Sequence, residues 1–313
     1  VITAPSLDIS GDIDVDGTAN LDVVDIDGAV NLGSTFTFGN AAYIIGNATN
    51  GIRINKSDDS LNLFKFLDDG SFQTVTLGTS NLRLGLNAGN SIVSGGNYNT
   101  VVGDEAGTAI TTGDANTALG FLALRADTLG SRSTAIGQGA LYTQNFTSAT
   151  NAYNTAVGYS AGEKVTTGTN NTLIGGLAGD AITTATDSVA LGYLALTSTT
   201  TGIRNHAIGR QSLHNNTTGA DNVGVGSSSL FANTTGFYNV AVGTDALVTN
   251  TTADNNTAVG YAALKLNTTG TVNTAVGMNG LLSNTTGVRN VSVGAAALDA
   301  NTTGDDNVAI GYA

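Results

Sequence analysis

The chain of 313 residues contains no cysteine and no tryptophan, and it has one proline, Pro5, and one methionine, Met278. Without cysteine there is neither a disulfide framework nor a thiolate metal site. The near absence of proline argues against a disordered linker. No apolar run approaches the roughly 18 residues that a transmembrane helix needs. Stability must therefore come from packing or from association between chains.

Charged residues are also scarce, at 11% of the chain, and the net charge is −13 with a pI of about 4.2. An acidic surface offers no basic footprint for nucleic acid or for an anionic membrane. We therefore expect no nucleic-acid partner and no membrane insertion. Glycine, by contrast, is abundant at 42 residues, and Val, Ile and Thr recur throughout. This composition favours an all-β fold.

A five-residue motif, Asn-(Thr/Val)-x-aliphatic-Gly, recurs from Asn99 to the end of the chain. Its spacing is 17 residues, except in one unit of 21 residues between Gly137 and Gly158. A unit of this length cannot close a hydrophobic core alone, whereas stacked units can. The thirteen closing glycines are Gly103, Gly120, Gly137, Gly158, Gly175, Gly192, Gly209, Gly226, Gly243, Gly260, Gly277, Gly294 and Gly311.

The unit is most complete at Asn256–Val272, which reads NTAVGYAALKLNTTGTV. Strand periodicity places Thr257 and Val259 on one side and Asn256 and Ala258 on the other. The closing glycine suits a strand end where φ is positive, and Asn-Thr-Thr-Gly is typical of turns. We predict a parallel β-solenoid, or β-roll, with Asn ladders hydrogen-bonded along its axis. The repeat columns that define it include Asn256, Val259, Gly260, Asn273, Val276, Gly277, Asn307, Ile310 and Gly311.

The N-terminal third has a different pattern. Residues 1–33 contain apolar positions between aspartates and two Asp-Gly pairs, at Asp16-Gly17 and Asp27-Gly28, which predict an N-terminal β-repeat stalk. Residues 34–98 are aromatic-rich and not periodic, and we interpret them as a small β-rich module. The third domain is the solenoid, residues 99–313. Because the chain begins at Val1 and ends within a repeat, we expect it to be processed or part of something longer.

Three repeat segments, Asn256–Gly260, Asn273–Gly277 and Asn307–Gly311, resemble the head repeats of trimeric autotransporter adhesins. The same 17-residue units resemble stretches of bacteriophage tail fibres, and the likeness covers roughly residues 81–313. The resemblance implies a homotrimer of left-handed parallel β-rolls. The unit departs from the adhesin pattern, since it is longer and carries an Ala-Leu and Thr-Thr-Gly insert.

Alanine recurs two residues before the closing glycine, and so small a side chain would allow another chain to approach closely. This column therefore favours a parallel homotrimer. Among its members are Ala118, Ala135, Ala241, Ala258 and Ala275.

The resemblance implies a bacteriophage tail-fibre shaft that presents host attachment, located in the virion. Its partners would be other virion tail proteins and a host surface receptor, a glycan or an outer-membrane component. The alternative is a bacterial surface trimeric adhesin or a secreted extracellular filament. A polysaccharide-degrading spike is less favoured.

Few residues suggest chemistry. Asp12–Gly17 begins like a calcium loop, but an EF-hand needs a bidentate Glu at its twelfth position, where Val23 stands. A glycosidase needs two carboxyls at a controlled separation, and the chain has only two glutamates. His206 and His214 are eight residues apart, and two histidines alone do not make a zinc site. We expect no enzymatic activity, no cofactor and no metal.

The 21-residue unit adds four residues within Thr143–Tyr153, where a longer turn would project from one face of the solenoid. Tyr142, Phe146 and Tyr153 are therefore candidate contacts with a ligand or a neighbouring chain. The alternative is a tolerated bulge, which we favour.

The Asn-Thr-Thr segments raise two further readings. They match the N-glycosylation sequon, which matters only in a eukaryotic secretory pathway. Stacked threonines also raise ice binding, but such arrays want Thr-x-Thr on one strand face, whereas Thr217 and Thr218 are adjacent.

Overall fold

The computed structural model of the chain describes residues 45–47, 51–55, 62–66, 72–73 and 78–312. The predicted stalk and the calcium-like segment Asp12–Gly17 lie outside the described residues. Four short strands form one small sheet in the order β1-β2-β3-β4, within the segment that we interpret as a β-rich module. They are β1 (Ile45–Asn47), β2 (Gly51–Asn55), β3 (Asn62–Phe66) and β4 (Phe72–Gln73).

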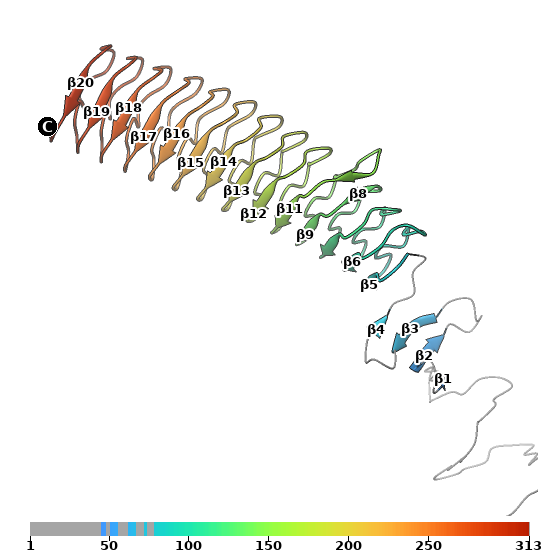
Figure 1. Ribbon diagram of the computed structural model, residues 1–313. Coiled ribbons are helices and arrows are strands. Elements are labelled where there is room, and N and C mark those ends of the chain that lie inside the picture. The colour runs from blue at the N-terminus through green and yellow to red at the C-terminus, as the bar shows by residue number, and fades with distance from the viewer. Residues whose placement is uncertain (1–44, 48–50, 56–61, 67–71, 74–77, 313) are drawn as a thin grey trace, which may run out of the picture. The chain divides into compact units, whose positions relative to one another are not determined.

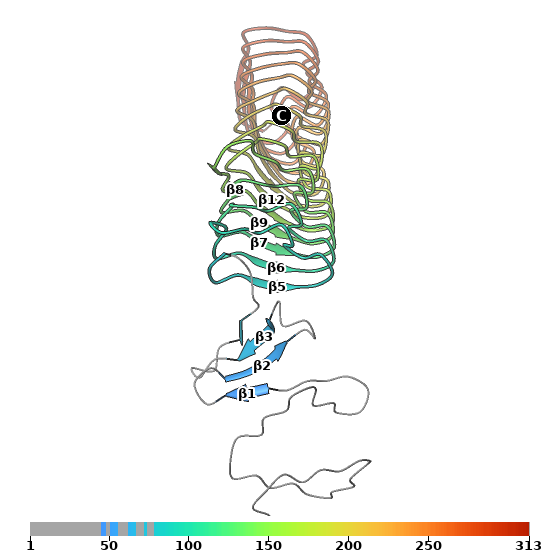
Figure 2. The same cartoon turned by 90° about the vertical axis from the view of Figure 1, so that its right-hand side faces the viewer.

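Residues 78–312 form a parallel β-solenoid, in which one three-residue strand per coil joins a single sheet of 14 strands (Figures 1 and 2). Equivalent residues of successive coils pair directly, as Thr257 pairs with Thr274 and Ala258 with Ala275. The predicted all-β solenoid of 17-residue repeats is confirmed.

The strands of this sheet are β5 (Leu82–Leu84), β6 (Thr100–Val102), β7 (Thr117–Leu119), β9 (Thr134–Ile136), β11 (Thr155–Val157), β12 (Thr172–Ile174), β13 (Val189–Leu191), β14 (His206–Ile208), β15 (Val223–Val225), β16 (Val240–Val242), β17 (Thr257–Val259), β18 (Thr274–Val276), β19 (Val291–Val293) and β20 (Val308–Ile310). A separate pair, β8 (Gly130–Ser131) and β10 (Thr150–Asn151), lies in the longer coil.

The sheet begins one coil earlier than the repeat that starts at Asn99, because β5 pairs with β6. Arg83 stands in the alanine column of this first coil, which hides the motif in the sequence. Its Nε donates a hydrogen bond to the carbonyl oxygen of Ala88 at 2.6 Å.

The alanine column faces the inside of the coil. Its expected role at a contact between chains is therefore wrong: Ala258 and its equivalents Ala118, Ala135, Ala241 and Ala275 are 0% exposed. They belong to one core cluster together with buried leucines such as Leu264. The alternation predicted for the strand is correct, but a coil of 17 residues encloses little space. A methyl group is what fits there beside the leucine.

Two ladders of asparagine also lie in the interior, and the predicted axial hydrogen bonding is confirmed. In the strand ladder, the backbone N–H of Asn256 donates to Oδ1 of Asn239 at 3.0 Å. In the second ladder, Nδ2 of Asn267 donates to Oδ1 of Asn250 at 3.0 Å and to the carbonyl oxygen of Gly270 at 2.9 Å. The Asn-Thr-Thr asparagines from Asn216 to Asn284 are 0% exposed, so the folded chain offers these sequons to no glycosylating enzyme.

The closing glycines stack directly on one another. Gly260 has a φ of 140°, and a Cβ there would lie 2.5 Å from the carbonyl oxygen of Gly277. Side chains of any size are therefore excluded from this column. The segment after it, residues 261–266, makes turns and is neither a helix nor a second strand. Within these turns Ala262 and Leu264 have positive φ values of 54° and 49°.

Candidate functional surface

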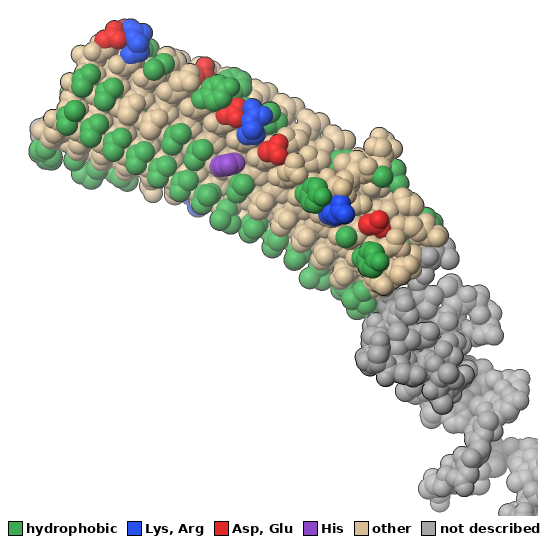
Figure 3. Space-filling model, in the orientation of Figure 1, with side chains coloured by type: hydrophobic (Ala, Val, Ile, Leu, Met, Phe, Trp, Pro, Cys, Tyr) green, Lys and Arg blue, Asp and Glu red, His purple; other side chains and the backbone are tan. Residues whose placement is uncertain are grey.

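The outward side of the strands carries an aliphatic ladder, which we call the outer aliphatic column: the residue before each closing glycine. Val259 and Val276 are 36% and 38% exposed, and Leu119 and Leu191 are each 44% exposed. Figure 3 shows rows of hydrophobic side chains along the solenoid. Large contiguous apolar surfaces on soluble proteins usually mark an interaction site. The repeat glycines and asparagines named in the sequence analysis thus support this ladder from inside.

Aromatic residues follow the closing glycine in several coils. Tyr159, Tyr193 and Tyr261 are 51–58% exposed. A Cβ at Gly176 would lie 3.6 Å from the ring of Tyr193, so this ring extends over the neighbouring coil. These rings widen the apolar surface on one side of the outer aliphatic column.

The residue before each inward strand asparagine forms a second outward column, which we call the turn ladder. Every member has a φ between 51° and 62°, the left-handed region. Its members are Tyr98, Ala115, Arg132, Tyr153, Asn170, Asp187, Arg204, Asp221, Tyr238, Asn255, Val272, Arg289 and Asp306.

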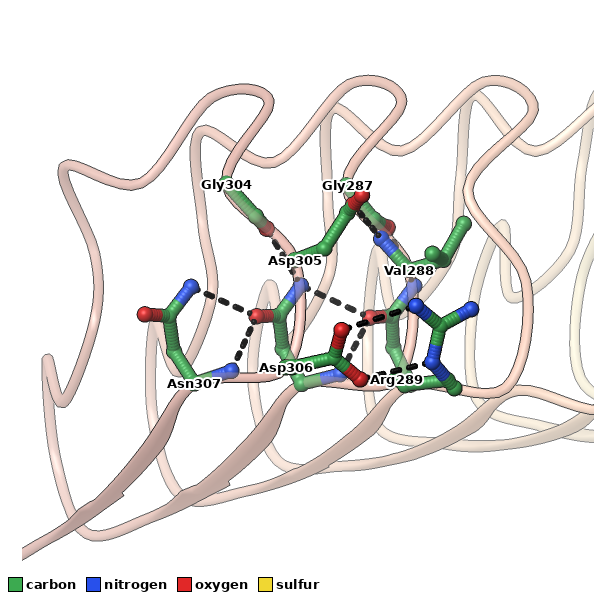
Figure 4. Close-up of polar contacts among 9 residues, drawn as sticks. Gly287, Val288, Arg289, Gly304, Asp305, Asp306 and Asn307 are labelled. Carbon is green, nitrogen blue, oxygen red and sulfur yellow. Dashed lines mark hydrogen bonds and ion pairs between the residues drawn. The ribbon is translucent and has the colours of Figure 1, made fainter.

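Two ion pairs connect neighbouring coils in the turn ladder. The guanidinium of Arg289 donates to both carboxylate oxygens of Asp306, at 2.6 and 2.8 Å, and Arg204 binds Asp221 at the same distances (Figure 4 shows the first pair). The hydrogen bond from Arg289 lowers the pKa of the Asp306 carboxyl below its ordinary value. Because both pairs are exposed, they contribute little to stability and chiefly define a polar surface.

The three candidate residues of the longer coil have different environments. Phe146 is 5% exposed, so it anchors the extra turn and is not available to a ligand. The hydroxyl of Tyr142 accepts a hydrogen bond from Nη1 of Arg125 at 3.0 Å. Tyr153 is 53% exposed, with the guanidinium of Arg132 5.7 Å from its ring centroid. The structure therefore leaves Tyr153 as the accessible member of the set.

A buried carboxylate at Asp127 is a feature that the sequence analysis missed. Nε2 of Gln144 donates to this 0% exposed side chain at 2.6 Å, and the backbone N–H of Gly130 donates at 3.0 Å. Gln144 also donates to Ser133 and accepts from Asn154. Burial raises the pKa of the Asp127 carboxyl. Aligning the units would have placed Asp127 and Gln144 in the column later occupied by asparagine.

The remaining candidate groups do not converge. His206 is an exposed member of β14, whereas His214 stacks on Phe231 with ring centroids 4.8 Å apart. Glu105 forms an ion pair with Arg125 at 2.9 Å. Within residues 78–312 and the short described strands, no group of three His, Cys, Asp or Glu side chains could hold a metal ion. No helix in the described part of the chain is long and apolar enough to cross a membrane.

Comparisons of the chain with known protein families, with curated proteins and with solved structures give no match. The class of the protein therefore follows from its architecture: it is a β-solenoid repeat protein.

Proposed function

We propose that this chain is a non-catalytic, adhesive fibre that associates with itself as a parallel homotrimer, and that it is the shaft of a bacteriophage tail fibre presenting host attachment. The observation that carries the proposal is the outer aliphatic column. It repeats in register on the outward face of β5–β20.

An aliphatic ladder of this kind supports association in a defined direction. Because one member recurs in every coil, two chains in parallel could align coil against coil along the solenoid. Fully burying a Val or Leu side chain contributes about 1.5–3 kcal/mol, so partial coverage repeated over many coils amounts to several kcal/mol per chain. The polar turn ladder beside it has the composition of an interface rim.

The association is tested by the molar mass of the purified chain, with sedimentation equilibrium as the measurement. We expect three times the 31.3 kDa of one chain. The double variant Val259→Asp/Val276→Asp should reduce the mass to that of a monomer, because it introduces charge into the outer aliphatic column. The matched control is Thr269→Asp/Thr286→Asp, which adds the same charge at exposed positions elsewhere on the coil. A wild-type monomer would contradict the homotrimer.

A bacterial surface trimeric adhesin or secreted filament is the alternative, since it would rely on the same self-association. The flanking sequence discriminates the two, because a membrane anchor indicates an adhesin and a particle-docking domain indicates a tail fibre. Cryo-electron microscopy of the source material provides the direct test. Rods on a capsid or tail support the viral fibre, and rods rooted in a cell envelope support the adhesin.

A polysaccharide-degrading spike is less favoured because it would need paired carboxyls. The carboxylate of Glu105 is engaged by Arg125. The hydrogen bonds to the buried Asp127 carboxylate come from Gln144 and from backbone N–H groups, so they show no second carboxyl there.

A further inference from the structure

Three tyrosines of the turn ladder occupy positions that the fold does not favour for them. Tyr98, Tyr153 and Tyr238 have φ values of 58°, 51° and 58°, a region in which Gly, Asn and Asp are favoured. They are also 65%, 53% and 60% exposed, so their rings add little to the core. Residues that break a local rule without a packing gain are expected at functional sites.

The surroundings of Tyr238 are the most developed of the three. The ring of Phe237 lies beside it, with centroids 6.4 Å apart and planes tilted by 43°. Phe237 is itself 38% exposed, and its backbone N–H donates to Asp254 at 2.7 Å. The preceding coil contributes Asp221, bound by Arg204. We call Phe237, Tyr238 and Asp221 with Arg204 the aromatic patch; hydrophobic, acidic and basic side chains adjoin in this way on the face drawn in Figure 3.

This combination of groups matches one ligand chemistry. A pyranose ring has a face of C–H groups that packs on an aromatic ring, and its edge carries hydroxyls that both donate and accept hydrogen bonds. Exposed aromatic rings supply the first contact. A carboxylate and a guanidinium supply charge-assisted partners for the second.

The local charge narrows the class further. Three carboxylates, those of Asp187, Asp221 and Asp254, lie in the coils around the patch, against the one guanidinium of Arg204. This excess of negative charge repels phosphates, sialic and uronic acids, and nucleic acid. We propose that the aromatic patch binds a neutral pyranose unit of a polysaccharide. The inference rests on the attachment role proposed above and assigns part of that role to the side of the shaft.

The pair Arg132–Tyr153 repeats this pattern on the same ladder, with the hydroxyl of Tyr153 accepting a hydrogen bond from Arg132 at 3.3 Å. Tyr153 and Tyr238 are five coils apart, or roughly 24 Å at strand spacing. A polysaccharide lying along the axis could therefore contact both tyrosines, which would raise its avidity over that of a single sugar.

The test is saturation-transfer NMR on the full chain with methyl glucoside, methyl galactoside and methyl mannoside, and with a methyl glucuronide as the anionic comparison. Irradiating the aromatic protons should transfer saturation to at least one neutral sugar, mainly to its C–H face. The double variant Phe237→Thr/Tyr238→Asn should reduce this transfer at least fivefold. Its residues are those of the same columns at Thr271 and Asn255, so the coil is expected to fold.

Val272→Asn is the matched control, because it makes the same kind of change in the turn ladder two coils away, and it should leave the transfer intact. No transfer to any neutral sugar, equal transfer in the double variant, or stronger transfer to the glucuronide would each overturn the inference. A loss of trimer in the double variant would also overturn it, by assigning the patch to a chain contact. A monomeric wild-type chain that still shows the transfer would contradict the proposed assembly and leave the sugar site standing.

Discussion

Two regions of the solenoid fill the same interior position in different ways. We call this position the corner column: the seventh residue after each closing glycine. From Asn216 to Asn284 it is always asparagine, and each amide donates to the preceding one, as Asn233 does to Asn216 at 2.9 Å. In earlier coils the column holds Ile110, Asp127, Gln144, Val165, Ile182 and Thr199.

The difference shows that one backbone path tolerates two kinds of support. Ile110 and Ile182 are 0% exposed and stabilise their coils by burial alone. Asparagine in the same column also binds the carbonyl oxygen of its own turn, as Asn267 does with Gly270. An aliphatic residue acts independently, whereas each asparagine is satisfied only when its neighbours are present.

The largest expected effect is that of Asn267→Ala. The substitution removes the bonds to Asn250 and Gly270 and leaves the Nδ2 of Asn284 without its acceptor on residue 267. Because unsatisfied buried polar groups cost about 1–3 kcal/mol each, we expect a loss of about 4 kcal/mol in the free energy of unfolding. Urea unfolding followed by circular dichroism is the measurement.

A smaller loss is expected for Ile182→Ala, in the aliphatic part of the same column. The change removes buried methyl and methylene groups but leaves no polar partner unsatisfied, so we expect a cost of about 2.5 kcal/mol. The same urea titration serves. A cost above that of Asn267→Ala would refute the idea that the asparagine ladder is the more interdependent support.

Asp127→Asn tests the one buried carboxylate of the corner column through pH. Burial raises the pKa of Asp127, so the folded chain holds this proton more tightly than the unfolded chain does. Its stabilising contribution is complete below the ordinary Asp pKa of about 3.9 and is lost as the pH rises through the raised value. We expect the variant to gain stability relative to the wild type as the pH increases from 4 to 7.

The matched control for that experiment is Asp306→Asn. The hydrogen bond from Arg289 lowers the pKa of Asp306, so its contribution is present above the ordinary pKa and lost as the pH falls through the lowered value. Relative to the wild type, this variant should therefore lose stability as the pH rises. Urea midpoints across the pH range measure both slopes, and slopes of the same sign would contradict the assignment.

The smallest expected effect is a gain. Val272 is a β-branched residue with a φ of 60°, a strained combination, and it is 51% exposed. Val272→Asn should raise the free energy of unfolding by about 0.5–1 kcal/mol, because Asn tolerates the left-handed region. Thermal unfolding measures the gain. Val272→Ala, which resembles the coil at Ala115, should give less of it.

Much of the architecture could be predicted from the sequence, because its features are local. The period follows from the spacing of the motif, and the strand faces follow from the alternation in segments such as Asn256–Gly260. The candidate surface was less predictable. Phe146 looked available because it lies in an added turn, yet it is buried, and Asp127 went unnoticed because its partners are 17 to 19 residues away.

The sequence by itself determined the repeat, the position of each strand and the glycine column, since a period of 17 residues with alternating side chains allows little else. Only the tertiary structure decided which strand face is the interior. Both faces read as apolar, with alanine on one and valine on the other. Closing so short a coil leaves room for the methyl of Ala258 and the hydrogen-bonded amide of Asn256, so the larger Val259 lies outside.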